Sequence, residues 1–115
     1  MKNLNYDPVE SRWWKARVAY LLTYAPEMTA RMFRRNKKGL YQSIAQEVDK
    51  ALNLQGKLTQ QGSLNKDQIV EVVQSAVAPT EGIPPEGNEL PEDLYLEIRD
   101  WAENPPESPK TATML

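Results

Sequence analysis

The chain has 115 residues, of which 40% are hydrophobic and 26% are charged, a composition typical of one soluble globular domain. Cysteine and histidine are both absent, which excludes disulfides, thiol nucleophiles, imidazole metal ligands and the commonest general base. The net charge of -2 conceals an asymmetry, because residues 1–57 hold 11 Lys and Arg against 5 Asp and Glu, whereas residues 58–115 hold 3 against 11.

The first helix that the sequence predicts runs from Asp7 to Tyr24. Asp7 is its expected N-cap, Pro8 occupies the first helical position, and Glu10 is placed to complete a capping box. Apolar residues fall on two faces of this helix, so most of its circumference is apolar. Such a helix is buried on both sides, either at the centre of its own domain or partly against another chain. The sequence leaves both alternatives open.

The next two predicted helices are separated by a turn over residues 36–39. The first of them begins at Pro26, and Gly39 is expected to end it in a left-handed C-terminal conformation. The second covers residues 40–54 and is expected to end at Gly56, before a polar loop. Each of these helices carries one apolar face toward a core.

A fourth helix is predicted over residues 66–78. Asn65 is its expected N-cap, and Leu64 and Ile69 have the spacing of a hydrophobic staple. The expected buried stripe consists of Ile69, Val72, Val73, Ala76 and Val77.

The second half of the chain is rich in residues that interrupt helices. Seven of the nine prolines lie at or after position 79, so residues 79–88 are predicted to be a linker and residues 104–115 a disordered tail. Between them, residues 89–103 have the spacing of an acidic amphipathic helix. Residues 1–78 form the predicted basic helical domain. The expected fold is therefore all-α, a small bundle of four to five helices with a flexible acidic C-terminal segment.

One group of cations, which we call the basic cluster, lies on the second predicted helix and in the turn after it. It consists of Arg31, Arg34, Arg35, Lys37 and Lys38. Like charges at helical spacing repel by about 0.2–0.5 kcal/mol per pair, so the helix gains nothing from them, whereas an anionic partner does. Guanidinium groups suit phosphate and carboxylate, and sequence-independent contact with nucleic acid is mostly of this kind. An acidic protein surface and a merely solvated basic face are the alternatives.

The second and third helices also permit a helix-turn-helix interpretation. In it Tyr41, Gln42 and Gln46 face the bases of DNA. Short connections that contain glycine occur in any helical bundle, so this pattern is not specific.

The apolar faces of the first and last helices are candidates for a protein interface, because Trp and Tyr are typical contact anchors. The candidate residues are Trp13, Trp14, Tyr20, Leu21, Tyr24, Leu94, Ile98 and Trp101. A second copy of the chain or another protein is the expected partner.

The acidic helix is expected to compete for the basic cluster within the same molecule. Its carboxylates are Glu92, Asp93, Glu97, Asp100 and Glu103. A short tether makes such a contact intramolecular, which raises the local concentration of these carboxylates and favours even a weak pairing.

No catalytic or metal-binding motif is visible, so the sequence predicts a non-catalytic protein without a cofactor or a metal. The expected function is that of a small helical interaction or regulatory protein whose basic cluster contacts an anionic partner, with nucleic acid favoured. The alternative is a helical adaptor or subunit of a protein assembly with no nucleic-acid role. Neither a signal peptide nor a membrane-spanning run is visible, so a cytoplasmic protein without a membrane partner is expected.

Overall fold

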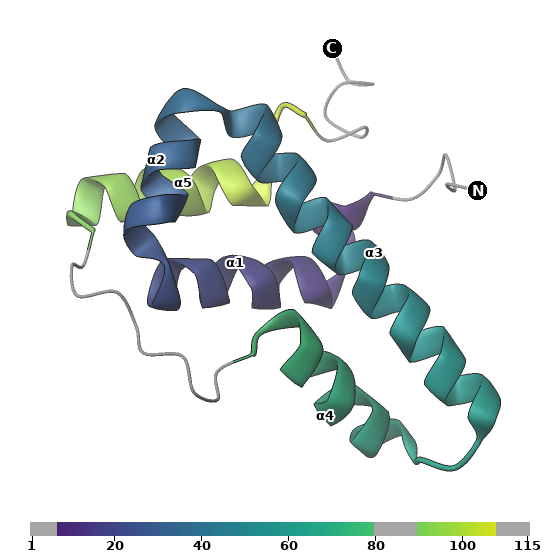
Figure 1. Ribbon diagram of the computed structural model, residues 1–115. Coiled ribbons are helices and arrows are strands. Elements are labelled where there is room, and N and C mark those ends of the chain that lie inside the picture. Colours follow the sequence, from purple (N-terminus) through teal and green to yellow (C-terminus); the bar gives the residue numbers. More distant parts are fainter. Residues whose placement is uncertain (1–6, 80–89, 108–115) are drawn as a thin grey trace.

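The computed structural model describes residues 7–79 and 90–107. These residues form five α-helices and one short 3-10 helix and contain no strand, so the all-α prediction is confirmed for the described part of the chain (Figure 1). The elements are η1 (Pro8–Glu10), α1 (Arg12–Tyr24), α2 (Pro26–Arg35), α3 (Lys37–Gln61), α4 (Lys66–Val77) and α5 (Glu92–Glu103). Most of the predicted linker and the end of the predicted tail lie outside the described residues.

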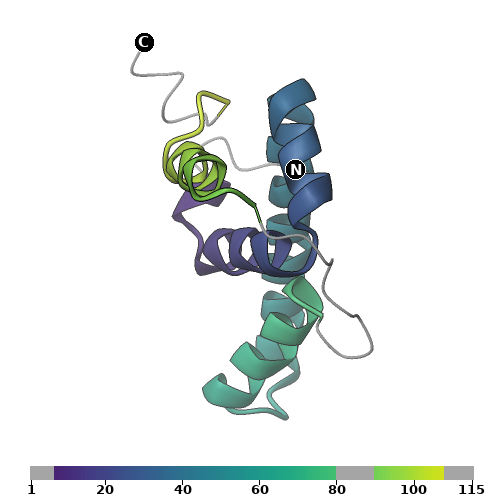
Figure 2. The ribbon, with the colours of Figure 1, turned by 90° about the vertical axis from the view of Figure 1, so that its left-hand side faces the viewer.

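Helix α1 is the centre of the fold. It packs against α2, α3, α4 and α5, with α5 on one side and α4 on the other (Figure 1 and Figure 2). Trp13, Trp14 and Leu21 are its buried side chains, exposed by only 1%, 2% and 4%. Its apolar circumference is therefore covered largely by helices of the same chain, which is the central-helix alternative left open by the sequence.

Helix α5 contributes to the same core. Ile98, Trp101 and Ala102 are buried, and the Trp101 ring meets the Phe33 ring of α2 edge to face at 5.7 Å between centroids. The Trp14 indole Nε1–H of α1 donates a buried hydrogen bond of 2.9 Å to the Ala102 carbonyl oxygen. Pro105, in the segment after α5, is also fully buried. The acidic helix is thus docked on α1 and α2 by apolar contacts.

The first helical segment begins differently from the prediction. Asp7 does cap it by accepting a hydrogen bond from the Val9 N–H, but the turn that follows is the 3-10 helix η1. Ser11 then adopts an extended conformation and accepts a hydrogen bond from the Trp13 N–H. Because the extended Ser11 interrupts the helical conformation, α1 begins at Arg12 and not at Asp7.

The turn between α2 and α3 consists of Asn36 alone. Asn36 ends α2, and its side-chain oxygen accepts a hydrogen bond of 2.9 Å from the Gly39 N–H in the first turn of α3. A Cβ atom at Gly39 would collide with the Asn36 side-chain amide. The predicted left-handed Gly39 is therefore wrong, because the cap needs a close approach and not a positive φ.

Helix α3 also continues past its predicted end at Gly56. One glycine inside a helix costs about 1 kcal/mol, whereas Leu54 and Leu58 on either side are partly buried against the core. Their burial outweighs that cost, so residues 57–61 are helical and not a loop. The helix ends instead at Gly62, whose φ of 71° is left-handed.

These two glycines provide a matched pair of stability predictions. Gly56→Ala should raise the free energy of unfolding by about 0.5–1 kcal/mol, because nothing lies within 4 Å of the added Cβ and the site is helical. Gly62→Ala, equally open, should lower it by about 1 kcal/mol, because its φ is strained for alanine. Urea denaturation of both variants checks the prediction, and shifts of the same sign would contradict it.

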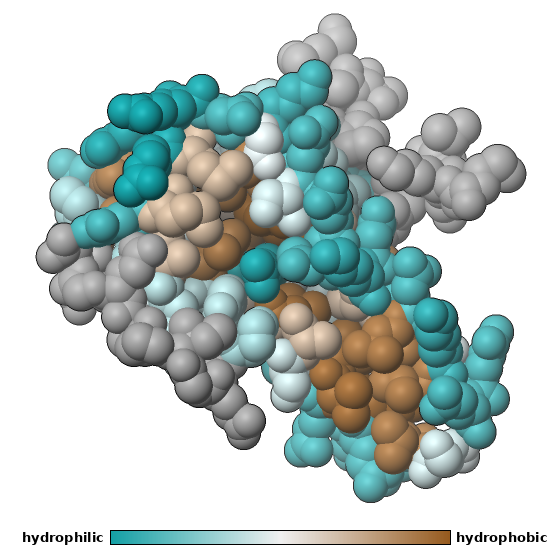
Figure 3. Space-filling view, viewed as in Figure 1, coloured by the Kyte–Doolittle hydropathy of each residue, from teal (hydrophilic) through white to brown (hydrophobic). Residues whose placement is uncertain are grey.

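Helix α4 begins as predicted but buries a narrower stripe. Asn65 and Gln68 form a reciprocal capping box through two hydrogen bonds of 2.9 Å. Ile69, Val73 and Val77 are buried, whereas Val72 is 41% exposed. Ala76, also predicted to be buried, is exposed. Helix α4 packs mainly on α3 and α1, so one narrow face is covered. Apolar surface remains over α4 and the adjoining part of α3 (Figure 3).

Candidate anion-binding site

The structure places all five residues of the basic cluster on the surface. Arg31, Arg34 and Arg35 lie on the outer side of α2, while Ala30 and Phe33 of the same helix are buried. Lys37 and Lys38 lie in the first turn of α3 and are exposed too. Because a single residue joins the two helices, the five exposed cations lie close together in the chain, on α2 and in the first turn of α3.

The acidic helix leaves this surface positively charged. Glu47 of α3 forms ion pairs elsewhere, at 3.8 Å from Arg17 and 3.7 Å from Lys50. No ion pair within the described ranges joins the basic cluster to a carboxylate of α5. The competition expected from the acidic helix therefore finds no support in the contacts, because α5 docks through Ile98 and Trp101 while its carboxylates are exposed.

The helix dipoles stabilise some cations of the basic cluster and destabilise others. Arg34 and Arg35 lie in the last turn of α2, where the helix dipole favours positive charge. Lys37 and Lys38 lie in the first turn of α3, where the dipole disfavours it. The Lys37 ammonium is also 4.5 Å from the centroid of the Phe33 ring, a favourable cation–π contact. The exposed Lys38 thus has no stabilising role visible in its own helix.

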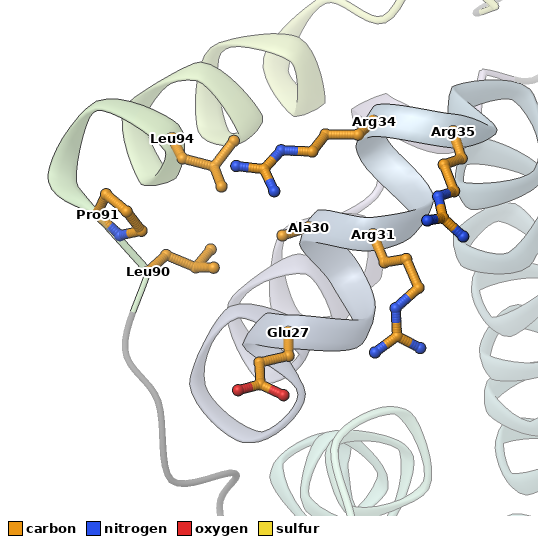
Figure 4. A pocket seen from close by; sticks show the side chains of 8 residues that line it. All are labelled: Glu27, Ala30, Arg31, Arg34, Arg35, Leu90, Pro91 and Leu94. Carbon is orange, nitrogen blue, oxygen red and sulfur yellow. The ribbon is translucent and has the colours of Figure 1, made fainter.

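An open groove of about 550 Å³ lies between α2 and the start of α5. Its lining residues are Glu27, Ala30, Arg31, Arg34, Arg35, Leu90, Pro91 and Leu94. In Figure 4 Arg34 reaches from α2 toward Leu94, while Arg31 and Arg35 extend along the other side of α2. Arg34 thus lies beside an apolar wall that helical periodicity could not predict, because the wall comes from a distant part of the chain.

Most residues predicted for a protein interface lie in the core of this chain. Trp13, Trp14, Leu21, Ile98 and Trp101 are each at most 8% exposed. A partner could reach them only if the bundle opened, because their neighbours belong to the same hydrophobic core. The interface prediction for these five is therefore corrected to core packing.

Three residues of the predicted interface remain partly exposed. Tyr20 and Tyr24 of α1 stack with their ring centroids 5.3 Å apart, and the Arg17 guanidinium lies 4.9 Å from the Tyr20 centroid. Leu94 of α5 is half-buried and lines the groove. These three are the members of the set that a partner can touch without unfolding the bundle.

The helix-turn-helix interpretation does not fit the geometry of α2 and α3. The DNA-binding motif has a turn of three to four residues, whereas Asn36 alone joins these helices. Tyr41 is half-buried, with its ring 5.4 Å from that of Trp14. Gln42 and Gln46 are exposed, but without the turn they do not form a recognition helix of that kind.

The environment of Tyr41 leads to a pH prediction. Burial raises the pKa of its hydroxyl from 10.0 to about 12, and the Asp7, Glu107 and Asp49 carboxylates add smaller contributions in that order. Between these two values the folded chain keeps a proton that the unfolded chain releases. The resulting stabilisation is complete below pH 10 and is lost as the pH rises toward about 12. Urea denaturation across this range should show a smaller alkaline loss for Tyr41→Phe, and equal losses would contradict the assignment.

Comparison with protein-family models, curated protein sequences and solved structures finds no match for this chain. Within residues 7–79 and 90–107, no group of acidic side chains is arranged to hold a metal ion. In the same ranges, none of the helices has both the length and the apolar character needed to cross a membrane. The basic cluster and its groove are therefore the chemical features from which a function is inferred.

Proposed function

We propose that this protein is a non-catalytic interaction protein whose basic cluster contacts an anionic partner, and that this partner is nucleic acid. The observation that carries the proposal is the exposure of all five cations on α2 and in the first turn of α3, none of which forms an ion pair with a carboxylate of α5 in the described ranges. On the basis of the sequence, we propose that this contact takes place in the cytoplasm.

Electrostatics supports a polyanion as the partner of this surface. Cations that repel one another at helical spacing raise the free energy of the unbound protein, and a row of phosphates would relieve that repulsion. Each phosphate contact also releases condensed counterions, so binding becomes tighter as the salt concentration falls. The groove and the connection between α2 and α3 offer no base-reading geometry, so we expect contact with the backbone and little sequence preference.

The proposal is tested by fluorescence anisotropy with dye-labelled single-stranded and duplex oligonucleotides over a series of salt concentrations. The wild type should bind both at low salt, with a steep linear fall of log affinity against log salt. The double variant Arg31→Glu with Arg35→Glu should bind more weakly. Its slope should be shallower by about one for each phosphate that the variant no longer neutralises.

A matched control separates contact from net charge. Lys15→Glu with Lys57→Glu makes the same change of charge at two exposed sites on α1 and α3 that lie outside the basic cluster. It should preserve most of the salt slope. Equal effects of the two double variants, or no binding by the wild type at low ionic strength, would rule out nucleic-acid contact through the basic cluster.

A helical adaptor without a nucleic-acid role is the second candidate function. It is favoured by the apolar surface over α4 and the adjoining part of α3 (Figure 3). Val72 of α4 is 41% exposed and Leu52 of α3 is 36% exposed. Exposed apolar surface of this kind is typical of protein contacts when it is contiguous. Light scattering of the wild type and of Val72→Lys would show whether this surface joins two copies of the chain.

A further inference from the structure

The groove between α2 and α5 has two chemically different walls. Arg31, Arg34 and Arg35 supply three guanidinium groups, all exposed, and one carboxylate, that of Glu27, also lines the groove. The other wall is apolar and comes from the residues just before α5 and from its first turn (Figure 4). The apolar residues are Leu90, Pro91 and Leu94, with the buried Ala30 of α2. A ligand that fits both walls carries negative charge and an aliphatic group close together.

This pairing of walls discriminates among anionic ligands. A free phosphate or a nucleic-acid backbone would use the arginines and leave the leucines exposed to water. None of the described residues that line the groove is aromatic, so they offer a base no stacking platform. A fatty acid needs a long enclosed apolar channel, whereas this groove is open and its apolar wall is short. A protein segment, in contrast, presents carboxylates and aliphatic side chains at neighbouring positions.

We propose that this groove binds a segment of another protein in which acidic residues flank a leucine or an isoleucine. A carboxylate of the segment accepts paired hydrogen bonds from the Arg34 guanidinium, an interaction that suits the planar shape of both groups, while Arg31 and Arg35 add positive charge to the groove. The aliphatic side chain packs on Leu90 and Leu94. Among the described residues that line the groove, three guanidinium groups against one carboxylate give the surplus of positive charge that such a segment requires.

The location of Arg34 connects the two parts of this recognition. Its guanidinium extends toward Leu94, so the charged and the apolar contact lie next to each other (Figure 4). A carboxylate bound to Arg34 would therefore bring the neighbouring aliphatic side chain of the segment over Leu94. The volume of about 550 Å³ is enough for a few side chains, which corresponds to a short segment and not to a folded domain.

This inference does not depend on nucleic-acid binding, although the two ligands share arginines. A nucleic acid needs the charge of the basic cluster alone, whereas the acidic segment also needs the apolar wall. A substitution in that wall therefore distinguishes the two ligands.

The experiment uses the full chain and three dye-labelled probes. They are the peptide Glu-Glu-Leu-Glu-Glu-Leu, the same peptide with both leucines replaced by serine, and a short single-stranded oligonucleotide of similar charge. The wild type should bind the leucine peptide about tenfold more tightly than the serine peptide, because an aliphatic side chain is buried. Since this comparison needs no protein variant, it is free of any folding defect.

Protein variants then locate the contact. Leu94→Ser should reduce affinity for the leucine peptide about tenfold and leave affinity for the oligonucleotide unchanged. Leu96→Ser is the matched control, because Leu96 is a half-buried leucine of the same helix that does not line the groove. Arg34→Gln should weaken binding of both peptides. Circular dichroism of each variant verifies that the helices are retained.

Two results would overturn the inference. One is equal affinity of the wild type for the two peptides, and the other is an equal loss of affinity for Leu94→Ser and Leu96→Ser. If the oligonucleotide still binds in the first case, the inference fails while the proposed function stands. Selective binding of the leucine peptide without binding of the oligonucleotide would support the inference and reject nucleic-acid binding.

Discussion

Replacing Trp14 with alanine is expected to lower the free energy of unfolding by about 3–5 kcal/mol. Trp14 is 2% exposed, its ring lies 5.4 Å from that of Tyr41, and its indole N–H donates to the Ala102 carbonyl oxygen. The substitution leaves a large cavity and an unpaired buried carbonyl where α1, α3 and α5 meet. Small domains are stable by only about 5–15 kcal/mol in total, so the variant should lose a large fraction of its stability.

Urea denaturation followed by circular dichroism measures this loss. Trp14→Phe is the control, since it removes the indole donor but keeps most of the apolar volume, and its loss of stability should be clearly smaller. A Trp14→Ala variant destabilised by less than about 1 kcal/mol, the range of an average substitution, would show that Trp14 does not hold α5 to α1.

Removing α5 is expected to abolish cooperative folding of the remaining helices. A chain that ends at Pro79 loses Ile98, Trp101 and Ala102 from the core and exposes Trp14 and Phe33 to water. Burying side chains of this size stabilises a protein by about 1.5–3 kcal/mol each, so the truncated chain loses much of its total stability. Thermal unfolding of the truncated chain should therefore be broad or absent.

Point substitutions on α5 provide the matched comparison. Ile98→Ala should cost about 2–5 kcal/mol, because Ile98 is 1% exposed. Glu97→Ala, at the exposed neighbouring position, should change stability by less than about 0.5 kcal/mol. A cooperative, unshifted unfolding transition of the truncated chain would contradict the assignment of α5 to the core. It would restore the interpretation of α5 as a separable acidic competitor for the basic cluster.

The sequence predicts the helices best where their ends carry local chemistry. Pro26 begins α2 and Asn65 caps α4 as expected, because a proline at the first helical position and an amide N-cap act within one turn. The predictions for Gly39 and Gly56 are wrong because contacts beyond the local helix turn decide what these glycines do. The roles of these glycines depend on an Asn36 side chain that approaches closely and on leucines that pack against a distant core, neither of which is a local property.

The candidate site was predictable only in part. Exposure of the basic cluster follows from charge and helical spacing on one helix, since cations are rarely buried without a partner. Periodicity shows that α1 has two apolar faces but not what covers them, so Trp13 and Trp14 were equally compatible with an interface. The groove could not be predicted without the position of α5, because Leu90 and Leu94 meet Arg34 only after the chain has folded.

The single-residue joint at Asn36 also bears on how tightly a ligand is held. Asn36 closes α2 through its backbone N–H and opens α3 through its side chain, so the two helices share one hydrogen-bonded corner. The cations on either side of that corner cannot drift apart by flexing of a loop. Their backbone spacing is fixed before a partner arrives, and little backbone entropy is lost on association. The cost of adjustment therefore falls on the partner, and flexible polyanions or peptides should bind better than rigid ones of equal charge.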